Sequence, residues 1–202
     1  PKFLISSNDC VITPTRTDHI KTDKQSAPPC GLYLRIPANP DMEEWQPRIL
    51  AMRFVINQNK TYTRNMHVVE CTLQKDPPRD AVEKAAAFVQ IVKMSGLVAI
   101  INGPLKFVEA LDADGILTST IEDLKAAKAA LPDDKIVGLS CLSSKELAQS
   151  AVEEGADYVT FGTPLAAPDI KLTAWWSTLS QNPAAMIGPI AVEKARLYSA
   201  AG

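Results

Sequence analysis

Histidine is nearly absent from this sequence, in which only His19 and His67 occur among 202 residues. So small a supply excludes a histidine-based metal cluster and most arrangements in which histidine activates a nucleophile. The four cysteines contain no Cys-x-x-Cys pair, which excludes the common zinc and redox motifs. We therefore expect free thiols in a reducing compartment and a cytoplasmic protein.

Long apolar runs and blocks of like charge are also missing. The longest apolar stretches, such as residues 97–101, fall far below the ~20 residues that span a bilayer. The amino end has no extended apolar region of the secretory type, and because it starts with Pro1 we expect the true start to be missing. A net charge of −2 without any Lys/Arg block leaves no electrostatic footprint for a nucleic-acid backbone. Neither nucleic acid nor a membrane is expected as a partner.

The length of the chain favours one well-buried domain. Residues 1–30 mix Ser, Thr, Pro, Lys and Asp without a sustained hydrophobic period, which predicts a polar N-terminal tail or arm. From Gly31 onward, short apolar runs alternate with segments of helical spacing. The predicted strands are 32–36, 66–73, 97–101, 115–117, 135–139, 157–161 and 184–187.

This alternation indicates a parallel sheet covered by helices. The spacing of roughly 20–30 residues between strands suits a (β/α)₈ TIM barrel better than a doubly wound sheet. No Gly-x-Gly-x-x-Gly follows the first strand, which disfavours a dinucleotide-binding fold. We therefore predict a single α/β barrel domain over residues 31–202. Because the chain ends at Gly202, where an eighth strand should begin, we expect an open barrel or an eighth strand missing from the recorded chain.

The loops after the predicted strands hold the candidate site, because such barrels bind ligands at the carboxyl ends of their strands. These loops are rich in small hydroxyl residues and glycine and poor in charge. Ser140 and Ser143, together with backbone amides near helix starts, could hold a phosphate or another anion. Alternatively, Ser143 or Ser144 caps the helix that begins near Lys145.

Two charged residues in these loops have alternative interpretations. Asp123 is either a metal ligand or an acidic residue that the helix dipole favours in a first turn. Lys171, the only cation of the late loops, either contacts a phosphate or substrate or lies on the solvated surface. The Trp175–Trp176 pair is more typical of packing or a subunit contact than of a ligand platform. A homo-oligomer is therefore one of the arrangements that the sequence allows.

Three segments carry a family resemblance: Asp114-Gly-Ile-Leu-Thr-Ser-Thr-Ile-Glu-Asp-Leu124, Ile136-Val-Gly-Leu-Ser-Cys-Leu-Ser143 and Gly155-Ala-Asp-Tyr-Val-Thr-Phe-Gly162. They resemble the thiamine phosphate synthase family, which includes the thiazole tautomerases. In that family the enzyme joins a pyrimidine methyl diphosphate to a thiazole phosphate with loss of pyrophosphate, aided by magnesium. The resemblance implies a transferase of thiamine biosynthesis with a small phosphorylated heterocycle as ligand. At matching positions it implies Ser140 and Lys171 as catalytic residues, Asn102, Gly162 and Gly188 as substrate-binding residues, and Asp123 as the Mg²⁺ ligand.

Several positions depart from the family pattern. The family's Gln-x-Arg-x-Lys is Glu70-Cys-Thr72-Leu-Gln74 here, so both cations are replaced and a carboxylate has appeared. Losing one charge-assisted contact costs ~1.5–3 kcal/mol, so two such losses weaken diphosphate binding by about two to four orders of magnitude. Gly103 replaces one magnesium carboxylate, Leu142 replaces the tautomerase histidine, and Pro189 removes one backbone donor to phosphate.

These departures leave three hypotheses. The chain is a transferase of thiamine phosphate synthase type with a reorganised site, or it is a catalytically silent relative that binds a ligand or a protein partner. A third hypothesis, another phosphate-binding barrel enzyme such as an isomerase, is disfavoured by the missing acid and base residues.

Overall fold

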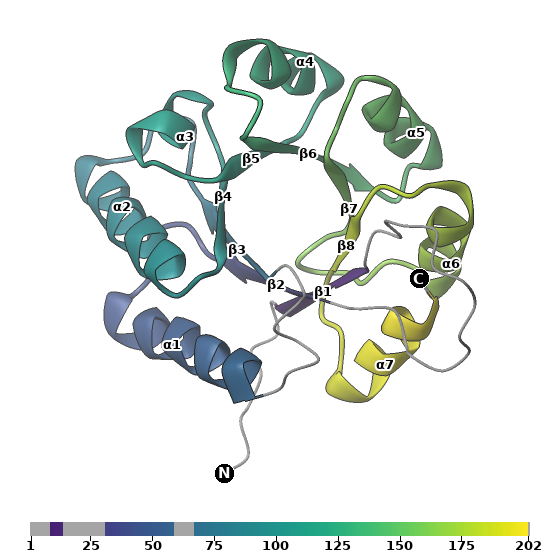
Figure 1. The fold of residues 1–202 in the computed structure, drawn as a ribbon, viewed down its shortest axis with the longest axis horizontal. Helices are drawn as coiled ribbons and strands as arrows, with labels where there is room; N and C mark the ends of the chain where they lie inside the picture. The colour runs from purple at the N-terminus through teal and green to yellow at the C-terminus, as the bar shows by residue number, and fades with distance from the viewer. Residues whose placement is uncertain (1–8, 14–30, 59–66, 202) are drawn as a thin grey trace.

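The computed structural model describes residues 9–13, 31–58 and 67–201, which form a closed barrel of eight strands surrounded by helices (Figure 1). The strands follow one another around the barrel in chain order, and β2 to β8 are all parallel to their neighbours in that series. The predicted α/β barrel with seven parallel strands is therefore confirmed. The bounds of these strands are β2 Gly31–Ile36, β3 Val68–Thr72, β4 Val98–Asn102, β5 Gly115–Thr118, β6 Ile136–Leu142, β7 Tyr158–Gly162 and β8 Ala184–Ile187.

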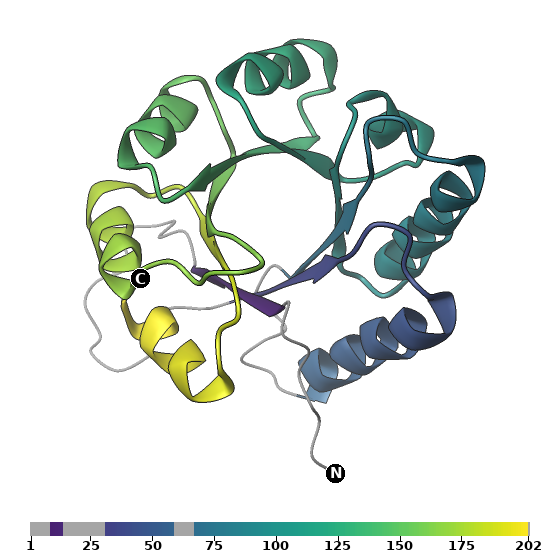
Figure 2. The ribbon, with the colours of Figure 1, turned by 180° about the vertical axis from the view of Figure 1, so that it is seen from behind.

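A helix follows each parallel strand and lies on the outside of the barrel, as both faces of the molecule show (Figures 1 and 2). The helices are α1 Met42–Gln58, α2 Arg79–Met94, α3 Lys106–Ala110, α4 Ile121–Ala130, α5 Lys145–Glu153, α6 Ile170–Leu179 and α7 Val192–Ala201. Thr120, Ser144 and Asp169 cap α4, α5 and α6, since each side chain accepts a hydrogen bond from a first-turn N–H. Within the described ranges, no helix has the length and apolar character needed to cross a membrane.

The strand β1, Asp9–Thr13, closes the barrel in the opposite direction. It pairs antiparallel with both β2 and β8, with Cys10 opposite Tyr33 and Ile12 opposite Ala185. It therefore stands between the first and the last parallel strand, where an eighth parallel strand was expected. Of residues 1–30, predicted as a tail or arm, residues 1–8 and 14–30 lie outside the described part of the chain.

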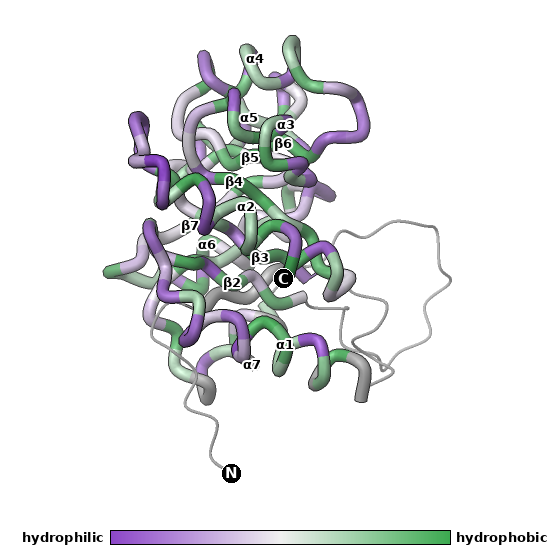
Figure 3. The backbone as a smooth tube through the Cα atoms, turned by 90° about the vertical axis from the view of Figure 1, so that its left-hand side faces the viewer, coloured by the Kyte–Doolittle hydropathy of each residue, from purple (hydrophilic) through white to green (hydrophobic). Residues whose placement is uncertain are grey.

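Alternate side chains along the strands pack into two separate cores, as the two-residue period of a strand requires. Outward side chains such as Leu34, Ile101 and Phe161 pack against the helices. Inward side chains fill the barrel itself, and they include Tyr33, Val68, Ile100, Leu117, Tyr158, Ala185 and Ile187. Figure 3 shows hydrophobic residues along the strands, with hydrophilic residues gathered at the outer turns. The polar inward residues of the same strands are therefore exceptions that need a physical reason.

Candidate functional site

The six residues predicted from the resemblance lie at one end of the barrel. Asn102 and Gly162 are the last residues of β4 and β7, Ser140 lies in β6, and Gly188 follows β8. Asp123 and Lys171 lie in the first turns of α4 and α6. Because the parallel strands end at the same face, the fold brings all six to that carboxyl face, although it does not by itself assign their roles.

A buried carboxylate organises the inner wall at this face. The side chain of Glu70, on β3, is 0% exposed. Its Oε1 lies 2.8 Å from Arg35 Nε in an ion pair and accepts a hydrogen bond from Asn102 Nδ2 at 2.7 Å, and its Oε2 accepts one from the Tyr33 hydroxyl at 2.8 Å. Both oxygens are thus bound, which is the condition for keeping a carboxylate out of water. The substituted position therefore carries a structured charge network that spans β2, β3 and β4.

The protonation of Tyr33 fits its role as a donor in this network. Burial, reinforced by the negative charge of Glu70, raises the pKa of Tyr33 well above its usual value. The phenol therefore stays protonated and donates to Glu70 over the physiological pH range. Asn102 donates its amide to the same carboxylate, so the side chain predicted to bind substrate is committed to Glu70.

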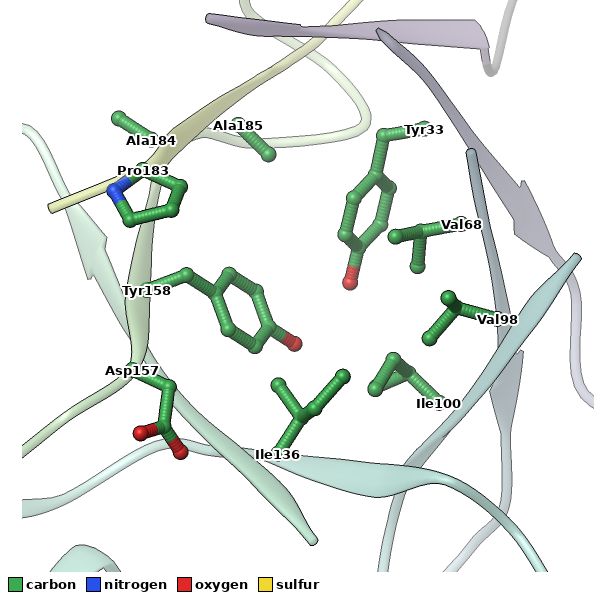
Figure 4. A pocket seen from close by; sticks show the side chains of 10 residues that line it. All are labelled: Tyr33, Val68, Val98, Ile100, Ile136, Asp157, Tyr158, Pro183, Ala184 and Ala185. Carbon is green, nitrogen blue, oxygen red and sulfur yellow. The ribbon is translucent and has the colours of Figure 1, made fainter. Parts of the chain in front are cut away.

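A cavity of about 120 Å³ lies inside the barrel near the opposite, amino end of the strands. Its lining includes Val68, Val98 and Ile136, which are the first residues of β3, β4 and β6. Figure 4 shows the phenol oxygens of Tyr33 and Tyr158 pointing into its middle. The hydroxyl of Tyr158 has no hydrogen-bond partner within the described residues. Because Tyr33 lines the cavity and also donates to Glu70, the cavity adjoins the Glu70 network, although its largely apolar lining does not resemble a phosphate site.

The geometry at Asp123 favours the helix-start interpretation. The Thr120 hydroxyl accepts the Asp123 N–H at 3.1 Å and donates to its carboxylate at 2.8 Å, which is a capping arrangement. No group of three or more His, Cys, Asp or Glu side chains placed to hold a metal occurs among the described residues. Because the Asn102 amide is bound to Glu70 and Gly103 offers no side chain, these residues do not fit a magnesium site.

The serines after β6 have separate positions. Ser144 is the N-cap of α5, where its hydroxyl accepts the Leu147 N–H at 3.1 Å. Ser140 lies on the inward side of β6 opposite Thr160, just before an irregularity in the β6–β7 pairing. Leu142, which replaces the tautomerase histidine, has a positive φ of 55° and an exposed side chain. The capping function thus belongs to Ser144, and Ser140 is the hydroxyl that faces the barrel.

The glycines of the site have structural reasons of their own. Gly162 has a φ of +90°, and a Cβ there would lie 2.0 Å from the carbonyl oxygen of Ile187. At Gly188 a Cβ would lie 2.4 Å from Ala167 Cα, in the loop that leads to α6. Lys171 is exposed, and its backbone N–H is capped by Asp169. Asp169 thus occupies the backbone donor of Lys171, which leaves the exposed side chain as the part of Lys171 that can meet an anion.

The residue that sequence reasoning missed is Arg35. It faces inward because Tyr33 and Arg35 alternate with the outward Leu34 and Ile36. A signal was present in the sequence, since an arginine interrupts the hydrophobic run of residues 32–36 and the next strand contains Glu70. Opposite charges on neighbouring inward faces indicate an ion pair, and the register places Arg35 directly opposite Glu70.

Comparisons with known proteins agree with the barrel and with the resemblance. A family model described as thiamine monophosphate synthase matches residues 59–202. The thiamine-phosphate synthase of Rhodospirillum centenum is 30% identical over 184 residues, covering 86% of this chain and 84% of that protein. The thiamine-phosphate synthase of Methylobacillus flagellatus is 41% identical over 83 residues, covering 41% of this chain and 40% of its own.

A solved structure has the same fold. The thiamine phosphate pyrophosphorylase from Pyrococcus furiosus superposes with a TM-score of 0.62 at 21% identity, over 84% of this chain and 80% of that one. The match of the family model to well over half of the residues, and the relative that aligns along most of the chain, lead to the same conclusion. This chain belongs to the thiamine monophosphate synthase family.

Proposed function

We propose that this chain binds a phosphorylated heterocycle of thiamine biosynthesis at the carboxyl face of the barrel and is a poor catalyst of diphosphate displacement. The observation that carries the proposal is the buried Glu70 carboxylate, which lies 2.8 Å from Arg35 Nε and so neutralises the cation of this wall. Departure of a diphosphate builds up negative charge on the leaving oxygens and needs uncompensated cations or a metal. A wall whose arginine is already paired gives little of that stabilisation.

The remaining groups suit a smaller task. Ser140 contributes a hydroxyl from β6, and Lys171 contributes an exposed ammonium at the start of α6. A hydroxyl and a single flexible cation are sufficient to orient a monophosphate, whereas a diphosphate with magnesium needs more charge. In this proposal Ser140 and Lys171 contact the phosphate, and Asn102 lies beside the ligand with its amide bound to Glu70.

A second candidate function is the full transferase reaction of the family, and one observation favours it. Arg35 places a guanidinium on the inner wall even though position 72 carries threonine, so the site has not lost every cation. In this alternative Arg35 takes part in holding the diphosphate, and turnover is measurable with both substrates and magnesium.

One experiment separates the two candidates. Purified protein is incubated with the pyrimidine methyl diphosphate, the thiazole phosphate and Mg²⁺, and thiamine phosphate is quantified. In parallel, calorimetry measures binding of thiazole phosphate and of thiamine phosphate. We expect binding without turnover. Turnover comparable to that of an authentic synthase overturns the binding proposal, and the absence of both binding and turnover overturns both candidates.

Two variants test the site itself. Lys171→Ala and Ser140→Ala should each weaken binding of thiamine phosphate by roughly tenfold, the size of one lost polar contact. The matched control is Lys125→Ala, because Lys125 lies on α4 and pairs with Glu154 away from the inner wall. Equal affinities for Lys171→Ala, Ser140→Ala and the control would place the ligand elsewhere.

We also propose a cytoplasmic location. Cys71 and Cys141, which belong to the described part of the chain, are buried free thiols, and this supports a reducing compartment. A homo-oligomer remains a proposal that size-exclusion chromatography with light scattering tests directly.

A further inference from the structure

The Arg35–Glu70 pair lies at the level of the barrel where a ligand would enter. Arg35 is the penultimate residue of β2, and Glu70 reaches the side chain of Asn102, the last residue of β4. All three side chains are therefore at the carboxyl end of the inner wall. Arg35 retains 22% of its side-chain exposure, whereas Glu70 has none.

The guanidinium of Arg35 keeps most of its donors. It has five N–H groups, and the ion pair with Glu70 is made through Nε, which lies 2.8 Å from Oε1. Among the described residues, the structure shows no other ion pair or hydrogen bond of this guanidinium. The two terminal amino groups form a planar fork suited to phosphate and carbonyl oxygens, and no described residue is recorded as their partner.

The charge of the pair decides which ligand is accepted. Glu70 is held by two hydrogen bonds and one ion pair and is completely buried, so it can neither move away nor be screened by water. An anion at the fork of Arg35 is attracted by the guanidinium and repelled by the carboxylate directly behind it. The attraction and the repulsion both grow with the charge of the ligand and largely cancel, so the pair stabilises a diphosphate little more than a monophosphate.

We propose that Arg35 is a ligand-binding residue of the carboxyl face and that Glu70 is its internal counter-ion, which removes the preference for a diphosphate over a monophosphate that an unpaired arginine would give. This inference rests on the proposed function only in placing the ligand at the carboxyl face. It adds Arg35 as the residue that binds the charged group of the ligand and Glu70 as the residue that limits the charge accepted there.

The test removes the charge of Glu70 while keeping its shape. Glu70→Gln retains an oxygen that can accept from Arg35 and Asn102. Calorimetry with inorganic phosphate and with inorganic pyrophosphate, both without metal, compares this variant with the wild type. We expect the affinity for pyrophosphate to rise by about tenfold or more and the affinity for phosphate to rise less.

Two further variants assign the effect. In the double variant Arg35→Gln/Glu70→Gln both charges are absent, and the gain in pyrophosphate affinity should disappear. Tyr33→Phe removes one hydrogen bond to Glu70 but no charge, so it should show no such gain. Circular dichroism and thermal unfolding establish that each variant is folded.

Two results overturn the inference. The first is a folded Glu70→Gln protein with the pyrophosphate affinity of the wild type, and the second is a gain that persists in the double variant. If the wild type binds neither thiazole phosphate nor thiamine phosphate, yet Glu70→Gln shows an Arg35-dependent gain, the proposed function fails while this inference is supported.

Discussion

Asp157 is bonded twice to Val137: its backbone N–H donates to the Val137 carbonyl at 2.8 Å, and its carboxylate accepts the Val137 N–H at 2.7 Å. Asp114 is bonded in the same two ways to Ala99, at 2.8 and 2.7 Å. Each aspartate immediately precedes a strand and ties it to the strand before it. The aspartate of the Gly155-Ala-Asp157 segment therefore holds β6 and β7 in register.

Asp157→Ala should lower the free energy of unfolding by about 1–3 kcal/mol, since the buried Val137 N–H loses its acceptor. The loss of the contact with Lys128 Nζ, at 2.8 Å, adds little because both side chains are partly exposed. Urea unfolding measures the change. Asp133→Ala, at an exposed position between α4 and β6, is the control and should stay within about 0.5 kcal/mol of the wild type. Equal stabilities for the two variants would contradict the structural role of Asp157.

Gly162→Ala should be much more destabilising than Gly96→Ala. Both glycines have positive φ, so both substitutions cost about 1 kcal/mol in backbone strain. Only at Gly162 would the new Cβ also meet a backbone oxygen, that of Ile187 at 2.0 Å, whereas nothing lies within 4 Å at Gly96. We expect an additional cost of about 2 kcal/mol or more for Gly162→Ala in thermal or urea unfolding. A cost equal to that of Gly96→Ala would mean that β7 and β8 separate easily at this point.

Thr160→Val should leave the stability unchanged or increase it. The Thr160 hydroxyl is completely buried and has no hydrogen-bond partner within the described ranges, so its removal relieves a desolvation cost of about 1 kcal/mol or more. Thr118 gives the matched comparison, because it is also buried but donates to the Gly138 carbonyl at 2.8 Å. Thr118→Val should therefore be destabilising by about 1 kcal/mol. A destabilised Thr160→Val protein would indicate a water bound to this hydroxyl inside the barrel.

Alkaline pH should destabilise the fold through two buried thiols. Burial raises the pKa of Cys71 and of Cys141 to about 12, whereas a cysteine in an unfolded chain ionises near about 8.5. Folding therefore favours the protonated thiol, and this contribution is complete below about pH 8.5 and is lost as the pH rises towards about 12. Urea unfolding between about pH 7 and about pH 10.5 should show falling stability. The variant Cys71→Ala/Cys141→Ala, less stable at neutral pH, should show a flatter pH dependence, and an unchanged slope would assign the effect to other groups.

The parts of the fold that the sequence could predict are those with a local signal. The run at residues 97–101 predicts β4, Val98–Asn102, and the run at 184–187 coincides with β8. By contrast, β1 gives no such signal, because Asp9–Thr13 becomes a strand only by pairing with β2 and β8, which lie far along the chain. Long-range pairing of this kind is invisible to any reading of hydrophobic period.

The sequence predicts candidate residues in loops that the barrel brings to one face, but it does not reveal the contacts between their side chains. The resemblance identified Glu70 as a substitution, yet its meaning depends on Arg35, which becomes its partner through the register of β2 and β3. The sequence likewise left the cap of α5 open between Ser143 and Ser144, because local spacing suits either residue. The structure assigns the cap to Ser144 through its bond to the Leu147 N–H.

The antiparallel strand that closes the barrel also sets the order in which the molecule can be completed. Val11 lies opposite Met186 in the β1–β8 pair, so the wall joins a segment that is synthesised earlier to one that is synthesised later. Until β8 has been synthesised, β1 can pair with β2 only, so its other edge is unpaired. The strand synthesised last has a second unpaired edge. We therefore expect a nascent or truncated chain that lacks β8 to be an open sheet with two unpaired strand edges. Such edges favour aggregation and chaperone binding over the formation of a smaller barrel.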